Sequence, residues 1–503
     1  MRAVSEHLDV LVVGAGISGI GAGWHLQTSC PDRTYAILEA RHDLGGTWDL
    51  FRYPGIRSDS DMYTLGYSFK PWTGRRAIAD GGAILAYLRE AARENGIDRK
   101  IRFRHRAKRA SWSSADARWT VEVERDGRDV VHLGCSFLFM CSGYYDYAAG
   151  YTPELPGRER FRGRIVHPQQ WTDDVAYAGK RVVVIGSGAT AVTLVPALAE
   201  RAAHVTMLQR SPTYVMSMPA EDRVAGWLHR RLPARLAYGL ARWKNVLLGL
   251  WFYRFCRRRP RRARALLERW LKRELGADYP ASPDFDPHYD PWQQRLCLVP
   301  DGDLFRSIRE GRASVVTDRI DTFTETGVRL RSGTELPADL VVTATGLNLL
   351  FLGGVDVVVD GRHVDFAKTW NYKGMMFSDV PNLALAIGYT NASWTLKAEL
   401  ICRYVCRLLN HMRATGTRQC TPRLRDARIE AAPFLDLTSG YIQRSLHLFP
   451  KQGSKIPWRL HQNYARDLLM LRRGTVDDGV MEFSNPAAAI PAEDERAGRA
   501  AAG

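Results

Sequence analysis

Residues 8–26, LDVLVVGAGISGIGAGWHL, decide the fold class of this 503-residue chain. They form an apolar strand-like run, a turn in which Gly14, Gly16 and Gly19 have GxGxxG spacing, and the start of a helix. The first glycine permits the tight turn, the second lets a pyrophosphate approach the backbone, and the third lets the helix pack closely on the strand. Glu39 follows 25 residues after Gly14, where a ribose hydroxyl needs an acceptor. The stretch therefore predicts a dinucleotide-binding unit at the start of the chain.

The same pattern recurs in residues 179–199, GKRVVVIGSGATAVTLVPALA, with Gly186, Gly188 and Ala191 in the three turn positions. Here a basic residue, Arg210, follows 24 residues after Gly186, and Ser211 comes next. A carboxylate accepts hydrogen bonds from a free ribose hydroxyl and repels a 2′-phosphate, whereas a guanidinium fork binds phosphate oxygens. The first unit is therefore predicted to bind FAD and the second to bind NADPH. The other contacts expected from the two turns are Ser18, Ser187, Ala189, Thr190 and Val192.

Most of the excess positive charge lies in one segment of the chain. The formal net charge is +17, and residues 223–273 contain sixteen basic residues and one acid. The segment has a helical period, mixes aromatic residues with arginines, and has an apolar core, NVLLGLWFY, that is too short to span a bilayer. Three interpretations stay open: a solvated helical insert, a membrane-surface element, or a nucleic-acid-binding patch. No other part of the chain resembles a nucleic-acid-binding motif, so we expect no nucleic-acid partner.

The N-terminus and the cysteines indicate the cellular compartment of the protein. The chain does not begin with a cationic start followed by an unbroken apolar stretch, which predicts that it has no signal peptide. Eight cysteines without a CxxC pair predict neither a disulfide framework nor a zinc site, and Cys402 and Cys406 are interpreted as small buried apolar residues. We expect a cytoplasmic protein without a metal, associated peripherally with the inner face of the cell membrane if the basic segment binds lipid.

The two glycine turns predict two interleaved, three-layer α/β domains of the Rossmann type, with a helical insert. The runs CSFLFMCSGYY and ADLVVTATGLN end in small residues with Gly143 and Gly346, as last strands do where the chain returns to another domain, and GYTPELPG supplies a linker. The predicted boundaries are 1–148 and 347–484 for the FAD domain, 149–220 and 291–346 for the NADPH domain, 221–290 for the insert, and 485–503 for a disordered tail.

Two nucleotides in one chain imply that hydride passes from nicotinamide to flavin and that another group then accepts the electrons. A disulfide reductase would need a pair of redox cysteines near the first helix, where Cys30 stands alone, so oxygen is the expected acceptor. Residues 161–171, FRGRIVHPQQW, place Phe161, Gly163, His167 and Trp171 in FxGxxxHxxxW spacing between the two turns. This motif resembles the fingerprint of Baeyer–Villiger monooxygenases, which are class B flavoproteins.

The resemblance extends over nearly the whole chain, through LGGTWDLFRYPGIRSDSDMYTLGYSF, QRLCLVPDGDLF, VVTATGLN, GYTNASWTLKAEL and PKQGSKIPWRLHQNY. It implies an NADPH-reduced flavin that forms a peroxyflavin with oxygen, converts ketones into esters or lactones, and also oxygenates sulfides and thioamides. By motif match, Arg295 is the cation that stabilises the oxyanion, and Asp59 is the carboxylate that orients it. The match also implies a set of cofactor contacts: Thr47, Trp48, Asp49, Leu50, Arg57, Ser58, Asp59 and, through its backbone to the adenine, Ala107.

Two residues depart from the family pattern. Thr172 follows the fingerprint tryptophan where the family usually has proline or aspartate. This departure affects the expected rigidity of the linker and not the assignment to the class. Gln294 precedes Arg295 where family members often have lysine, so recognition of the 2′-phosphate depends more on Arg210. Because no second histidine follows His167 at metal-ligand spacing, we expect His167 to have a structural or hinge role.

Three alternative functions stay open at this stage. An NADPH oxidase or flavin reductase would release peroxide in step with NADPH consumption, whatever ketone is added. A basic membrane-surface or nucleic-acid-binding protein with regulatory nucleotide sites would turn over little NADPH. An S- or N-oxygenating flavin monooxygenase usually has a related fingerprint that ends in a different aromatic residue, so Trp171 favours the Baeyer–Villiger class.

Overall fold

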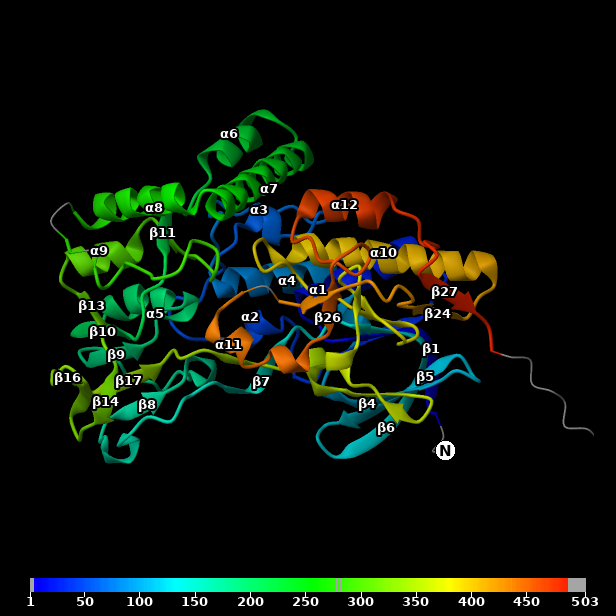
Figure 1. Cartoon of the computed structure of the whole chain (residues 1–503), viewed down its shortest axis with the longest axis horizontal. Coiled ribbons are helices and arrows are strands. Elements are labelled where there is room, and N and C mark those ends of the chain that lie inside the picture. Colours follow the sequence, from blue (N-terminus) through cyan, green and yellow to red (C-terminus); the bar gives the residue numbers. More distant parts are fainter. Residues whose placement is uncertain (1–3, 277–278, 281, 436, 487–503) are drawn as a thin grey trace, which may run out of the picture.

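The computed structural model describes residues 4–276, 279–280, 282–435 and 437–486. Two domains, each built on its own sheet, lie side by side, and a group of helices lies along their upper edge in Figure 1. This arrangement confirms the predicted α/β class with two Rossmann-like domains and a helical insert. The predicted tail, 485–503, lies outside the described residues from residue 487 on.

The first domain contains a nine-stranded sheet to which distant parts of the chain contribute. β1 pairs in parallel with both β2 and β6. Its last four residues, Val10 to Val13, are all buried, so both faces of the strand are covered there, which explains its apolar sequence. In spatial order the strands are β20 (Arg362–His363), β19 (Asp356–Val359), β4 (His105–Ser113), β5 (Arg118–Arg125), β6 (Asp129–Met140), β1 (Glu6–Val13), β2 (Tyr35–Leu38) and β3 (Ile101–Arg102), and β23 (Leu383–Leu385) pairs with the end of β6. Strands that precede the second domain in the sequence and strands that follow it therefore share one sheet. The individual domain boundaries stay predictions.

Helices α1 (Ile17–Ser29), α4 (Gly81–Glu94) and α10 (Trp394–Thr415) form a layer above this sheet (Figure 1). The sulfur of Cys30, at the end of α1, lies 3.7 Å from the carbonyl oxygen of Cys406 in α10. All eight cysteines of the chain are buried free thiols, which confirms the interpretation of Cys402 and Cys406 as small core residues.

The second domain contains a five-stranded, fully parallel sheet. Its order is β13 (Ala313–Thr317), β10 (His204–Gln209), β9 (Arg181–Ile185), β17 (Leu340–Thr343) and β8 (Arg164–Val166). Helices α5 (Ala189–Ala199) and α9 (Asp303–Arg309) accompany it, and β14 (Ile320–Phe323), β15 (Gly327–Leu330) and β16 (Glu335–Pro337) form a separate antiparallel sheet. The second glycine turn therefore lies between a central strand and a buried helix, as its sequence predicts.

The two crossings between the domains run side by side. β7 (Tyr145–Gly150) leaves the first domain, β18 (Leu347–Leu349) returns to it, and the two pair as an antiparallel ribbon. Gly143 and Gly346, predicted to mark these exits, both have positive φ, as left-handed glycines do at chain reversals. A paired ribbon couples the two crossings, so a rotation of one domain against the other must bend both together.

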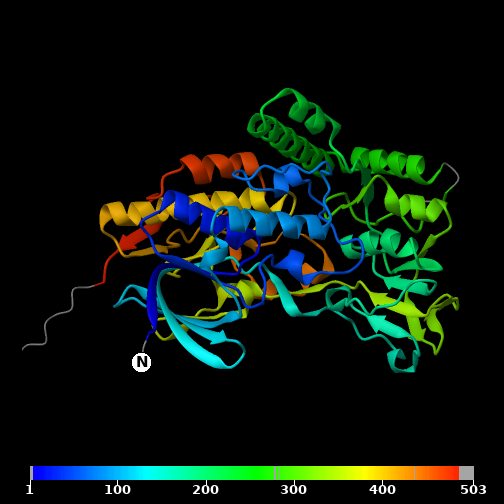
Figure 2. The ribbon, with the colours of Figure 1, turned by 180° about the vertical axis from the view of Figure 1, so that it is seen from behind.

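The basic segment folds into three helices, α6 (Arg223–Arg231), α7 (Ala234–Arg258) and α8 (Pro260–Leu275). The strands that flank it, β11 (Val215–Met218) and β12 (Cys297–Pro300), pair in parallel and hold its two ends together. Figures 1 and 2 both show α6 and α7 at the periphery of the molecule. Among the described residues, no helix combines the length and the apolar character that crossing a membrane requires.

The remaining elements are short or belong to the C-terminal part of the first domain. The helices are α2 (Thr47–Leu50), α3 (Met62–Leu65), α11 (Gly440–Gln443) and α12 (Tyr464–Arg473). The strands are β21 (Asn371–Tyr372), β22 (Met376–Phe377), β24 (Gln419–Pro422), β25 (Ala431–Pro433), β26 (Lys451–Gly453) and β27 (Met481–Ser484). Short 3₁₀ turns occupy Asp98–Lys100, Arg158–Arg160, Pro168–Gln170, Phe351–Gly354, Phe366–Lys368 and Leu446–Leu448.

Candidate functional site

One cavity of about 1810 Å³ is bordered by both glycine turns. The first turn contributes Gly14 and Gly16, and the second contributes Gly186 and Gly188. This volume exceeds the range of an ordinary small-ligand pocket, as a site for two dinucleotides requires. The cavity therefore lies where the two domains can present their cofactors to each other.

The backbone of each turn needs glycine and leaves room for a ligand. Gly14 has φ +104°, and a Cβ there would lie 2.6 Å from the carbonyl oxygen of Cys141. Gly186 has φ +136°, and a Cβ there would lie 2.3 Å from the carbonyl oxygen of Ala344. By contrast, a Cβ on Gly188 would meet no described atom within 4 Å. This open space above the second turn matches the approach of a pyrophosphate to the backbone.

Glu39 lies at the end of β2, and only 6% of its surface is exposed. Its carboxylate accepts hydrogen bonds from the backbone N–H of Ala15, at 2.8 Å, and of Arg41, at 2.9 Å. Burial raises the pKa of Glu39, and the two N–H donors oppose that shift. The carboxylate is therefore held on the cavity wall beside the first turn, where an acceptor for a ribose hydroxyl was predicted.

We expect Glu39→Gln to bind FAD roughly tenfold more weakly, because a charge-assisted hydrogen bond to the ribose would become a neutral one. The measurement is the ratio of flavin to protein in purified material, followed by titration of the apoprotein with FAD. Glu124→Gln is the matched control, since Glu124 also borders the cavity and comes from the same domain. Equal flavin affinities for the wild type and Glu39→Gln would remove Glu39 from this role.

Arg210 lies at the end of β10 on the edge of the cavity, exposed to solvent. Its neighbour Ser211 accepts a hydrogen bond through its carbonyl oxygen from the hydroxyl of Ser187, at 3.0 Å, which ties this edge to the second glycine turn. Arg319 and Arg331 also border the cavity, and the backbone N–H of Arg331 donates to the carbonyl oxygen of Arg319 at 2.9 Å. The edge predicted to bind a 2′-phosphate thus has two further cations that sequence reasoning missed.

Arg295 and Asp59 form an ion pair on the cavity wall, with Nη2 2.8 Å from Oδ2 and 2.9 Å from Oδ1. Their side chains are 34% and 28% exposed, and this surface faces the cavity. The carboxylate of Asp59 raises the pKa of Arg295, so the guanidinium stays charged at any working pH. The structure therefore brings together the two residues that the motif match singled out as the reaction centre.

Three tyrosines surround this ion pair and were not predicted. Tyr144 and Tyr145 follow Gly143, and their hydroxyls lie 3.2 Å apart. Burial raises the pKa values of Tyr144, Tyr145 and Tyr441, so all three hydroxyls stay protonated near neutral pH. The CSGYY run carried a usable signal, since two aromatic residues directly follow the last strand of a nucleotide unit. Tyr441 lies in a segment without such a signal.

Trp394 closes the cavity on the side of the first glycine turn. Its indole N–H donates to the hydroxyl of Ser18 at 2.8 Å, and its ring stacks on Tyr144 with centroids 5.4 Å apart. Ser18, a predicted cofactor contact, thereby holds a wall residue as well. The start of α10 is thus fixed against the turn that opens α1.

Most of the predicted cofactor contacts border the cavity, and four do not. Those that do are Gly14, Gly16, Ser18, Glu39, Thr47, Trp48, Arg57, Ser58, Asp59, Ala107, Gly186, Ser187, Gly188, Ala189, Thr190, Val192, Arg210 and Ser211. The four that lie behind the lining are Gly19, Asp49, Leu50 and Ala191. Asp49 is buried and forms ion pairs with Arg41 and Arg52, which explains why its carboxylate does not face the cavity. The other three lie against the protein interior, where packing positions the two turns.

Arg57 borders the cavity but forms an ion pair with Asp303 of α9 in the second domain. Both partners are partly buried, with side chains 13% and 26% exposed. The guanidinium of Arg57 therefore has a carboxylate partner from the opposite domain. This pair joins the loop that contains Asp59 to the NADPH side of the cavity.

The fingerprint residues lie behind the cavity lining. Phe161 and Trp171 are buried, and a Cβ on Gly163 would lie 2.7 Å from the carbonyl oxygen of Asp339. His167 faces the carbonyl oxygen of Gly346 at 3.1 Å through Nε2, and its ring fills the space beside Gly150. Burial lowers the pKa of His167. It thus touches both interdomain crossings, a position that supports the predicted structural or hinge role.

Comparison with known proteins identifies the family. A flavin-binding monooxygenase-like family model matches residues 78–239, and an NAD(P)-binding Rossmann-like domain model matches residues 12–72. The FAD-containing monooxygenase EthA of Mycobacterium tuberculosis is 56% identical over 488 residues, which is 97% of this chain and 100% of that protein. This chain belongs to the class B, Baeyer–Villiger-type flavin monooxygenases. The predictions of a monooxygenase that uses FAD and NADPH are thereby confirmed.

Two further comparisons also cover nearly the whole chain. EthA of Mycolicibacterium smegmatis is 52% identical over 490 residues, covering 97% of this chain and 99% of its own. A solved structure of an oxidized steroid monooxygenase bound to NADP superimposes with a TM-score of 0.75, at 24% identity, and covers 95% of this chain and 100% of that one. The shared fold therefore includes both nucleotide-binding domains and the two crossings.

Proposed function

We propose that this monooxygenase inserts an oxygen atom into ketones to give esters or lactones and also oxygenates sulfides and thioamides, with Arg295 and Asp59 at the reaction centre. The observation that carries the proposal is the Arg295–Asp59 ion pair on the wall of the cavity that both glycine turns share. An insertion of this kind develops negative charge on the carbonyl oxygen, and a fixed cation stabilises that charge without reorganising. The ion pair supplies such a cation.

The residues present fit both cofactors. The first turn and the buried Glu39 would hold FAD, and the second turn with Arg210 would hold NADPH. When bound, FAD reduced by NADPH would supply the electrons that activate O2. Arg295 would hold the carbonyl oxygen of the substrate, and Asp59 keeps the guanidinium oriented. Tyr144 and Tyr145 keep their hydroxyl protons, so they would donate hydrogen bonds and not add negative charge beside the oxyanion.

The test is to incubate the purified protein with NADPH, oxygen and a panel of ketones and thioethers, and to identify the products by mass. We expect products that are one oxygen atom heavier, formed in proportion to the NADPH consumed. Peroxide released in step with NADPH, without oxygenated product, would instead establish the oxidase alternative. Oxygenation of thioethers alone would assign the chain to the S-oxygenating alternative.

We further propose that the protein works on small molecules in the cytoplasm, with residues 223–273 in peripheral contact with the inner face of the cell membrane. Nine of the thirteen large hydrophobic side chains that are exposed in the described residues belong to this segment, together with its arginines. Such a combination is unusual for a surface that meets only water.

A further inference from the structure

One face of α7 is apolar and exposed. Leu236, Leu240, Trp243, Leu247 and Trp251 follow one another at intervals of three or four residues, which places them on a single stripe of the helix. Their exposed fractions run from 43% to 59%. A surface helix of a globular protein normally has its polar side chains on this face. Trp243 contacts Tyr464 of α12, with ring centroids 5.7 Å apart, and the other four side chains of the stripe are exposed to solvent.

Arginines surround this stripe. Arg254 and Arg258 continue it at the C-terminal end of α7, and both are exposed. Arg261 and Arg262, at the start of α8, are exposed as well. In α6, Trp227 is exposed, and the guanidinium of Arg231 lies 6.0 Å from the centroid of its ring. Apolar and aromatic side chains bordered by cations have the chemistry of a helix that lies in the interface of an anionic bilayer.

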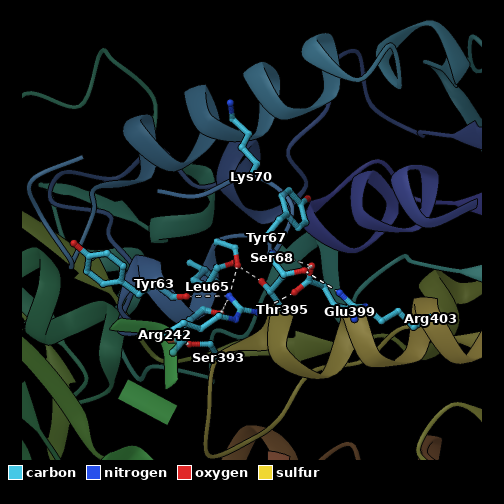
Figure 3. A network of polar contacts seen from close by, with 12 residues as sticks. Tyr63, Leu65, Tyr67, Ser68, Lys70, Arg242, Ser393, Thr395, Glu399 and Arg403 are labelled. Atoms are coloured by element: carbon cyan, nitrogen blue, oxygen red, sulfur yellow. Dashed lines mark hydrogen bonds and ion pairs between the residues drawn. The ribbon is translucent and has the colours of Figure 1, made fainter. Parts of the chain in front are cut away.

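The opposite face of α7 is anchored in the first domain by a buried ion pair. Nη2 of Arg242 lies 2.8 Å from Oε2 of Glu399 in α10, and the two side chains are 10% and 7% exposed. Nη1 of Arg242 donates to the carbonyl oxygen of Tyr63 in α3, at 2.9 Å (Figure 3). It also donates to the carbonyl oxygen of Gly66, which follows α3, at 2.7 Å. Arg242 is thus engaged inside the protein and is not part of the outer surface.

Further contacts complete the anchor. Oε1 of Glu399 accepts hydrogen bonds from the backbone N–H and the hydroxyl of Ser68, at 2.9 and 2.7 Å (Figure 3). Val246 of α7 packs in a buried cluster with Tyr389 and Leu396, and Tyr389 borders the cavity. A buried ion pair and a packed inner face fix how α7 is rotated about its axis, so the apolar stripe stays turned outward.

We infer that the outer face of α6, α7 and the start of α8 docks on an anionic lipid bilayer, with α7 lying flat, its apolar stripe in the acyl boundary and its arginines at the headgroups. This inference deepens the proposed peripheral contact and rests on it for the partner class. At about 1.5 Å per residue, a helix of 25 residues offers a long contact parallel to the surface. A second copy of this chain would bring its own cations against these, and nucleic acid would leave the leucines and tryptophans of the stripe unused.

The test is co-sedimentation of the FAD-loaded protein with vesicles of phosphatidylglycerol and phosphatidylcholine in equal parts, and with vesicles of phosphatidylcholine alone. We expect binding to the anionic vesicles that weakens in about 0.5 M salt. The double variant Leu247→Ser/Trp251→Ser is expected to bind about tenfold more weakly or worse, because it loses apolar insertion. Arg258→Gln/Arg262→Gln is expected to bind roughly 30-fold more weakly, because two cations leave the headgroup region.

Matched controls separate these effects from general damage. Val130→Ser removes an exposed apolar side chain from β6, and Arg99→Gln/Arg362→Gln removes two exposed arginines from the first domain, so both variants should bind like the wild type. All variants should turn over a water-soluble ketone at the wild-type rate. Vesicle binding and oxygenation are thus measured separately, and the loss of one does not imply the loss of the other. Wild-type binding by the stripe variant, a dimer that this variant dissociates, or equally tight binding to duplex DNA would each overturn the inference.

Discussion

Arg295→Ala is expected to keep reduction of its flavin by NADPH and to lose oxygenation of ketones by about 10²–10³-fold, or roughly 3–4 kcal/mol in the barrier. Flavin reduction transfers hydride between the two cofactors and develops no charge on the substrate oxygen. Oxygen insertion does develop that charge, and Arg295 is a cation paired with a carboxylate on the cavity wall. Anaerobic stopped-flow absorbance measures the first step, and mass analysis of the ester measures the second.

Two further variants make the Arg295 experiment specific. Asp59→Asn should lose less activity than Arg295→Ala, because the guanidinium stays in place but is held by a neutral partner. Arg329→Ala is the matched control, since it breaks an exposed arginine–aspartate pair with Asp321 in the second domain. Retained ester yield in Arg295→Ala would remove Arg295 from its assigned role, and equal losses in Arg329→Ala would mean that the effect is structural.

The fold was predictable from the sequence because its signals are local. Each glycine turn follows an apolar strand within a few residues, and each needs glycine for contacts that the structure shows at Gly14 and Gly186. The pairing of β19 with β4 and of β23 with β6 is different. It joins residues more than 200 positions apart, so no local pattern specifies it, and only Gly346 at the end of β17 indicated the return of the chain.

The candidate site was predictable only where a motif carried it. Arg295 and Asp59 are 236 residues apart, and in a chain with many arginines their pairing follows from the resemblance and not from spacing. Tyr441 and Arg319 reach the cavity from segments with no recognisable pattern. Asp49 shows the opposite case, because it lies inside a matching motif and yet its carboxylate forms buried ion pairs with Arg41 and Arg52. Sequence proximity to a cofactor turn does not decide which way a side chain faces.

The basic segment shows how composition alone leaves a function open. Sixteen basic residues in 223–273 are compatible with a solvated insert, a lipid surface or nucleic acid. The structure separates the arginines by environment, since Arg242 is buried against Glu399 whereas Arg258 and Arg262 are exposed. Helical periodicity could indicate that Leu240 and Leu247 share a face, but the direction of that face depends on the anchor to α3 and α10.

Arg210→Ala is expected to raise the KM for NADPH roughly 10- to 150-fold, corresponding to the loss of about 1.5–3 kcal/mol from charged hydrogen bonds to the 2′-phosphate. The KM for NADH should change little, because NADH has a hydroxyl at that position and makes no such contact. Arg319 and Arg331 border the same edge and will retain part of the phosphate affinity, so the loss should fall short of complete. Steady-state kinetics with both nucleotides, using one ketone at saturation, measure the change.

Arg201→Ala provides the control for this change of coenzyme preference. Arg201 lies in the same domain with its guanidinium 5.8 Å from the ring centroid of Tyr177, so its removal takes away a surface cation without touching the cavity edge. The ratio of NADPH to NADH efficiency should stay at the wild-type value in this variant and fall in Arg210→Ala. If Arg210→Ala lowers both efficiencies equally, Arg210 supports the fold of the second turn and does not read the phosphate. A preference lost only when Arg210 and Arg319 are both replaced would show instead that the two arginines share the phosphate.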